Sequence, residues 1–144
     1  TMHTDQVPII NIIKKIEQIY LKIKPTLVLM PFSKDIHTDH QVISKASISC
    51  TKWFRFPSIK KVLSYETLSE TNWSQNNGFF KPNVFIDISK YLEQKIKIMN
   101  IYRTEIEPFP FPRNEKTIRA QSALNGSQSG YKAAEAFELL LERY

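Results

Sequence analysis

The fold is decided by the stretch Thr26-Leu-Val-Leu-Met30, an apolar run between Pro25 and Pro31. A short apolar run between residues that break regular structure is typical of a strand buried in a parallel sheet. Before it, residues 9–23 carry isoleucines at helical spacing with lysines between them. This pattern predicts an amphipathic helix that begins near Pro8 and ends before Pro25. A second helical pattern follows the strand over residues 39–49.

The rest of the chain continues this alternation of helices and strands. The patterns predict strands over residues 60–66 and 83–88 and helices over residues 89–103, 115–123 and 132–143. Residues 107–112, Glu-Pro-Phe-Pro-Phe-Pro, form neither helix nor central strand because their prolines lack backbone donors. We expect that segment to be extended, at the surface or along a groove. The whole pattern predicts one α/β domain over residues 1–144, a Rossmann-like layered sheet with flanking helices and some parallel pairing.

The order of the elements is unusual for this class, because an α/β sheet usually opens with a strand and this chain opens with a helix. Thr1 also precedes Met2. We therefore expect a longer or clipped protein, from which this chain lacks the amino-terminal strand–helix half.

Composition narrows the functional class. The 144 residues are 42% hydrophobic and 12% aromatic, which is enough for a core and excludes general disorder. The single cysteine, Cys50, excludes an intramolecular disulfide and a cysteine-based zinc cluster. No apolar run reaches the ~18 residues of a membrane span, so we expect a soluble, cytoplasmic protein. The net charge of +6 comes from dispersed lysines, so we do not expect nucleic acid as a partner.

Two of the three histidines lie in Asp35-Ile-His-Thr-Asp-His40, just after the strand at residues 26–30. Ligands of open α/β sheets bind at the carboxyl ends of strands. There one imidazole can bind a metal, an aspartate can fix an imidazole tautomer, and the other imidazole can donate a proton. The ordinary alternative is a turn in which Asp35, Thr38 or Asp39 caps the next helix. The motif alone leaves both interpretations open, since two histidines are not a full zinc ligand set.

Several further segments match the pattern of a known protein family, and they occur in the same order along the chain. The matching segments are residues 7–30, 35–41 and 82–90, then Lys95, Tyr102, Arg119-Ala120, Gly126, Gly130 and Ala134-Glu-Ala-Phe137. Together they resemble the PIG-L/LmbE family of zinc-dependent N-acetylglucosaminyl deacetylases over nearly the whole chain. The resemblance implies zinc-dependent hydrolysis of an N-acetyl group on an amino sugar or sugar conjugate.

The resemblance also implies roles for particular residues. His40 corresponds to a zinc ligand. His37 corresponds to the histidine beside the scissile amide, which stabilises the oxyanion or protonates the leaving amine. Asp39 corresponds to the aspartate that orients this histidine. Beside these carried-over roles, Arg113 and Arg119 are candidates for contact with a sugar phosphate or a nucleotide in the cleft of the missing half, against the ordinary alternative of solvated helix positions.

The chain departs from the family at one point. The family's first signature, His-Pro-Asp-Asp, supplies two further zinc ligands and the general base, and this sequence has no such segment. His3-Thr-Asp5 is the other histidine–carboxylate cluster, but no strand–turn–helix pattern surrounds it. We therefore expect this chain to be incomplete for catalysis.

Two other functional classes remain open. The chain is alternatively a non-catalytic or partner-dependent half that binds a complementary chain, a second copy or a sugar ligand. Such a half should expose an apolar sheet edge or face. A basic module for an anionic ligand is a third class, with little support from the sequence. We expect a structural hydrogen bond for Glu135 and a buried, inert thiol for Cys50. The aromatic residues of 53–56, Phe79 and Phe80 should pack against the sheet, with stacking on a sugar as the functional alternative. Residues 69–80 and 107–112 should shape substrate choice.

Overall fold

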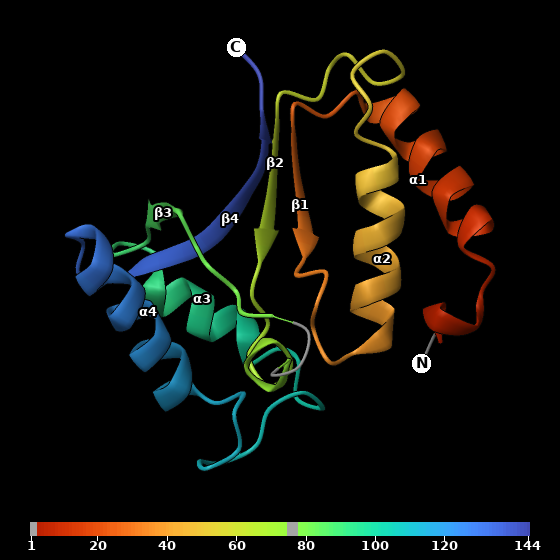
Figure 1. Cartoon of the computed structure of the whole chain (residues 1–144). Helices are drawn as coiled ribbons and strands as arrows, with labels where there is room; N and C mark the ends of the chain where they lie inside the picture. Colours follow the sequence, from red (N-terminus) through yellow and green to blue (C-terminus); the bar gives the residue numbers. More distant parts are fainter. Residues whose placement is uncertain (1–2, 75–77) are drawn as a thin grey trace. The chain divides into compact units, whose positions relative to one another are not determined.

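The computed structural model of the chain describes residues 3–74 and 78–144. The predicted substrate-shaping segment 69–80 therefore falls in part, at residues 75–77, outside the described residues. The described elements, drawn in Figure 1, are η1 (Thr4–Gln6), α1 (Ile9–Ile23), β1 (Leu27–Pro31), α2 (Thr38–Ser49), β2 (Lys61–Tyr65), η2 (Thr71–Trp73), β3 (Val84–Asp87), α3 (Leu92–Met99), α4 (Glu115–Ser129) and β4 (Ala134–Glu142). No helix in the described part of the chain is long and apolar enough to cross a membrane.

The strands form a four-stranded sheet in the order β1-β2-β4-β3. β1 and β2 are parallel, with Leu27 opposite Lys61 and Pro31 opposite Tyr65. β3 and β4 are antiparallel, with Val84 opposite Phe137. The α/β class and the partly parallel sheet predicted from the sequence are therefore confirmed.

The chain divides into two compact units. One contains the described residues up to Lys81 together with Glu138–Tyr144, and the other contains Pro82–Phe137. β4 contributes its first residues to the second unit and its last residues to the first. The single domain expected from the sequence remains a prediction.

In the first unit, α2 lies between β1 and α1 (Figure 1). Val28 and Met30 of β1 are buried, whereas Leu27 and Leu29 are 47% and 50% exposed. This alternation follows from the period of two along a strand. The core consists of Val28, Met30, Cys50, Phe56, Ile59 and Val62, and the side chains packed against it include Ile13, Ile16 and Tyr20 of α1.

In the second unit, α4 packs against α3 and β3. Asn114 caps α4 because its side-chain oxygen accepts the backbone N–H of Thr117 at 3.0 Å. The helix ends at Gly130, whose φ of 80° suits a residue without a Cβ. Gly126 lies where the chain returns across the helix, because a Cβ there would be 2.6 Å from the carbonyl oxygen of Tyr131.

The helix predicted over residues 132–143 is wrong, because residues 134–142 form the strand β4. The segment Ala-Glu-Ala-Phe-Glu-Leu-Leu-Leu-Glu is rich in helix formers. Pairing within the sheet overrides that propensity. The predicted helix over residues 115–123 extends instead to Ser129, and the one over residues 89–103 is shorter, Leu92–Met99.

Candidate functional site

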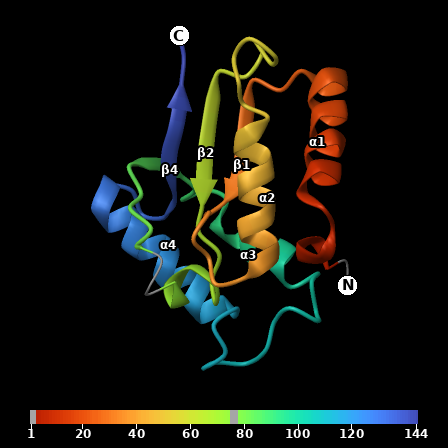
Figure 2. The ribbon, with the colours of Figure 1, turned by 45° about the vertical axis from the view of Figure 1, so that its right-hand side comes forward.

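The candidate site lies at the carboxyl ends of the parallel strands β1 and β2, where α2 begins (Figure 2). The loops that follow the two strands contact each other there. The backbone N–H of Ile36 donates to the carbonyl of Glu70 at 3.4 Å. The hydroxyl of Thr71 donates to Oδ1 of Asp35 at 2.6 Å. Because both strands end at the same edge, residues far apart in the sequence share one site.

Asp35 is fully buried at this edge. Its Oδ2 lies 2.8 Å from Nδ1 of His40, and its backbone carbonyl accepts the side-chain amide of Gln41 at 2.7 Å. A buried carboxylate requires such partners because desolvation is costly. Burial, and then the negative charge of Asp35, raise the pKa of Tyr65.

His37 is the residue that caps α2. Its Nδ1 accepts the backbone N–H of Asp39 at 3.2 Å, so the neutral ring carries its proton on Nε2. The rings of His37 and His40 are stacked, with centroids 4.9 Å apart. The capping role expected of Asp35, Thr38 or Asp39 therefore belongs to His37, because its imidazole nitrogen provides the acceptor that the first turn needs.

Asp39 contacts His37 through its backbone N–H, whereas its carboxylate accepts the backbone N–H of Asp5 at 2.7 Å. The hydroxyl of Thr38 donates to the carboxylate of Asp5 at 2.8 Å. Desolvation acts to raise the pKa of Asp39, but hydrogen bonds from Asp5 and Thr4 and the charge of His37 lower it overall. Asp39 therefore stabilises the junction between η1 and α2 and contributes to the position of His37 through its backbone.

Among the described residues, His40 has the surroundings of a zinc ligand, but these residues do not provide a complete zinc site. A histidine whose Nδ1 faces a buried carboxylate, as in His40, presents Nε2 as many metal-bound histidines do. However, residues 3–74 and 78–144 contain no group of three or more His, Cys, Asp or Glu side chains arranged to hold a metal ion. The region of His3 therefore does not complete a site within the described chain.

Arg119 lies in the second unit, on α4. Its guanidinium donates to Glu93 at 2.6 and 2.8 Å and to Glu115 at 2.9 and 2.8 Å. The bonds to Glu93 and then Glu115 raise the pKa of Arg119. A substrate contact by Arg119 stays a prediction, and Arg113 pairs with Glu105 at 3.2 Å.

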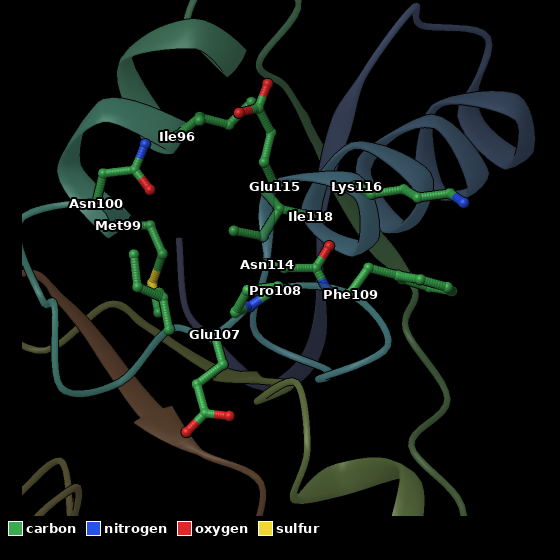
Figure 3. A pocket seen from close by; sticks show the side chains of 11 residues that line it. Ile96, Met99, Asn100, Glu107, Pro108, Phe109, Asn114, Glu115, Lys116 and Ile118 are labelled. Atoms are coloured by element: carbon green, nitrogen blue, oxygen red, sulfur yellow. The ribbon is translucent and has the colours of Figure 1, made fainter.

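The proline-rich segment lines a pocket of about 430 Å³ in the second unit (Figure 3). Glu107, Pro108 and Phe109 contribute to this pocket together with Ile96 and Ile118 of the neighbouring helices. The expected place along a groove is therefore confirmed, but the expected extended conformation is wrong. Residues 108–111 form a turn, in which the backbone N–H of Phe111 donates to the carbonyl of Pro108 at 3.0 Å. The role of the segment in substrate choice stays a prediction.

Among the other residues singled out from the sequence, Cys50 and Glu135 have structural surroundings, whereas several of the aromatic residues are exposed. Cys50 is buried, and burial and then the charge of Glu17 raise its pKa to about 11. Glu135 pairs with Lys95. Packing against the sheet was the expectation for the aromatic residues, but Trp53 and Phe54 are 64% and 62% exposed. They lie in the turn between α2 and β2, which turns their side chains to the surface.

The three further aromatic residues differ from one another in their surroundings. Phe56 is buried in the core, Phe80 packs edge-on against Phe32, and Phe79 is exposed.

Sequence reasoning did not assign Thr71 and Tyr65 to the site. Thr71 is 6% exposed and contacts Asp35, although the two residues are 36 positions apart. The useful signal is that both lie beyond the ends of neighbouring parallel strands. Periodicity does not reveal which polar residue of the second loop points inward.

The fold is similar to several solved structures, of which two are described here, whereas no protein-family model matches the chain. One is the conserved protein TT1542 from Thermus thermophilus, with a TM-score of 0.72 and 20% identity over 96% of this chain and 61% of that one. The other is N,N'-diacetylchitobiose deacetylase from Pyrococcus horikoshii, with a TM-score of 0.72 and 18% identity over 95% of this chain and 54% of that one. The chain thus spans 54% to 61% of the length of these structures. The likeness shows that this α/β fold is one that a deacetylase uses.

Proposed function

We propose that this chain takes part in the zinc-dependent hydrolysis of an N-acetyl group on an amino sugar or sugar conjugate, as in PIG-L/LmbE deacetylases. The observation that carries the proposal is the pair of stacked histidines at the carboxyl ends of β1 and β2, one of them held by a fully buried carboxylate. The fold shared with a diacetylchitobiose deacetylase supports it. The single buried thiol suits the cytoplasm, which we propose as the compartment.

The two histidines have different roles in this proposal. His40 provides Nε2 as one zinc ligand. His37 carries a proton on Nε2, and that N–H can donate to the acetyl oxygen or transfer its proton to the leaving nitrogen. The remaining zinc ligands and the general base come from outside the described residues.

A partner-dependent half is the second candidate function, and the edge strand β1 favours it. Among the described residues, β2 is the one neighbour of β1 in the sheet. Leu27 and Leu29 are half-exposed on one face of β1, although natural edge strands usually carry charges or prolines along their length. In this candidate function, a complementary chain covers β1 and completes the site.

The test combines metal content with acetate release. Zinc per chain is measured by elemental mass spectrometry after dialysis, and acetate release is followed with N,N'-diacetylchitobiose and N-acetylglucosamine derivatives. About one zinc per chain, with activity, would mean that this chain completes the site by itself or between copies. No bound zinc and no activity would favour the partner-dependent half.

Substitutions then test the assigned roles in whichever assembly is active. His40→Ala and His37→Ala should each reduce acetate release by at least about tenfold, the scale of losing one ligand or general acid. His3→Ala is the matched control, because His3 is exposed and outside the site. Full activity in His40→Ala would contradict the assigned role of His40.

A further inference from the structure

Three hydrogen bonds run in series from the loop after β2 to the ring of His40. The backbone N–H of Thr67 donates to Oγ1 of Thr71 at 2.8 Å. The hydroxyl of Thr71 donates to Oδ1 of Asp35 at 2.6 Å, and Oδ2 of Asp35 lies 2.8 Å from Nδ1 of His40. Thr71 and Asp35 are 6% and 0% exposed, so the bond between them is shielded from water.

The first hydrogen bond, from the backbone N–H of Thr67, determines which group donates in the bonds that follow. A backbone N–H can only donate, so Thr71 accepts from Thr67 and has its own proton free for Asp35. An ionised carboxylate can only accept, so the proton between Asp35 and the neutral His40 belongs to Nδ1 of the ring.

We propose that Thr71 and Asp35 are positioning residues that hold His40 in the Nδ1–H tautomer and so leave its Nε2 lone pair free for a cation. The use of that lone pair rests on the proposed function, but the tautomer does not. Neither residue touches a substrate in this proposal. Both act through His40.

The substitution Asp35→Asn tests this proposal, because a merely structural role of Asp35 would not change the tautomer of His40. The hydroxyl of Thr71 still points its proton at position 35, so the oxygen of the new amide takes the place of Oδ1. The amide NH₂ then faces Nδ1 of His40 and donates to it. The neutral ring must therefore move its proton to Nε2, and the tautomer is inverted.

A second substitution should restore the original tautomer. Thr71→Val removes the hydroxyl that directs the amide, so in the double variant Asp35→Asn/Thr71→Val the amide can turn its oxygen toward His40. His40 then returns to the Nδ1–H form. The matched control is Asp35→Asn/Thr71→Ser, which keeps the hydroxyl and should remain inverted.

The measurement is long-range ¹H–¹⁵N NMR of the imidazole rings in the 144-residue chain without metal. Spectra are recorded on the alkaline side, at a pH above which the imidazole ¹⁵N shifts no longer change, so that the neutral rings are observed. The three histidines are assigned with His3→Gln and His37→Gln variants, and backbone amide spectra establish that each variant is folded. His37 is an internal reference, because its capping contact keeps the proton on Nε2.

The expected pattern is Nδ1–H in the wild type, Nε2–H in Asp35→Asn and in the serine control, and Nδ1–H again in the valine double variant. A wild-type His40 protonated on Nε2 would overturn the proposal, even if a variant does not fold. A folded Asp35→Asn that keeps Nδ1–H would also overturn it. Since no metal or substrate is involved, this result is separate from the deacetylase assay, and either can fail alone.

Discussion

His37 and His40 lie in the same loop–helix junction, yet their surroundings favour opposite tautomers. Nδ1 of His37 accepts a helix amide, whereas Nδ1 of His40 faces a buried carboxylate. One ring therefore offers an N–H donor and the other offers a lone pair, with ring centroids 4.9 Å apart. A donor beside a potential ligand is the arrangement that the proposed polarisation of a carbonyl group needs. It arises from two different surroundings, a backbone amide at His37 and a side-chain carboxylate at His40.

Because of Cys50, the free energy of unfolding of the first unit should decrease at alkaline pH. Burial, and then the charge of Glu17, raise its pKa from 9.0 to about 11. The folded state therefore holds the thiol proton more tightly than the unfolded state. The stabilisation is fully present below pH 9 and is lost as the pH rises toward 11. Between pH 8 and pH 10.5 the loss should be about 2 kcal/mol.

Urea unfolding at these two pH values measures this effect. Cys50→Ala is the control, because it lacks the thiol but keeps Tyr20, whose pKa burial also raises, to about 12. The variant should therefore lose less stability than the wild type over the same interval. Equal losses in the two proteins would show that Cys50 does not carry the effect.

At the scale of elements, the helix α4 depends on a glycine for packing and not for flexibility. A Cβ at Gly126 would lie 2.6 Å from the oxygen of Tyr131 and 3.0 Å from the nitrogen of Ala133, both backbone atoms. Gly126→Ala should therefore destabilise the protein by about 1 to 3 kcal/mol, although alanine is the better helix former by roughly 1 kcal/mol. Thermal unfolding measures the change, with the exposed neighbour Ser127→Ala as the control. A variant as stable as the wild type would contradict this close approach.

The junction of η1 and α2 gives a second prediction at this scale. The carboxylate of Asp39 accepts the backbone N–H of Asp5. Asp39→Ala should therefore speed hydrogen exchange of the Asp5 amide. Exchange of the Lys24 amide, which donates to Tyr20 at the far end of α1, should not change. NMR exchange rates test this, and an unchanged Asp5 rate would mean that other contacts hold η1.

In the wild type, acidification should weaken the same contact between Asp39 and the Asp5 amide, and so lower the protection of that amide against hydrogen exchange. Because hydrogen bonds keep the pKa of Asp39 below its ordinary value, the contact is fully present above that value. It is lost as the pH falls through the lowered pKa.

The elements also show what the sequence can and cannot predict. The strands β1, β2 and β3 were predictable because apolar residues lie between breakers, and α1 because its isoleucines follow one helical face. β4 was not, since its alanines, leucines and glutamates favour a helix and only sheet pairing makes them a strand. In the site, the spacing of His37 and His40 drew attention to the right loop. The link from Asp35 to Thr71 required the register of β1 with β2.

At the scale of the whole molecule, the apolar edge strand β1 favours self-association, whereas the net charge opposes it. Leu27 and Leu29 expose apolar surface on a strand with one described neighbour, which favours pairing with another chain. The net charge of +6 repels a second copy at low ionic strength. Salt screens that repulsion, since the Debye length falls from about 30 Å at 0.01 M to about 10 Å at 0.1 M. Self-association should therefore increase with salt.

Leu29→Lys should suppress this salt-dependent association, because it places a charge on the exposed face of the edge strand. Leu21→Lys is the matched control: Leu21 is 62% exposed, but it lies on α1. Multi-angle light scattering at about 0.01 M and 0.5 M salt should show an increasing apparent mass for the wild type and for Leu21→Lys, and a constant one for Leu29→Lys. If all three proteins associate alike, β1 is not the contact, and the surface that receives a partner chain lies elsewhere.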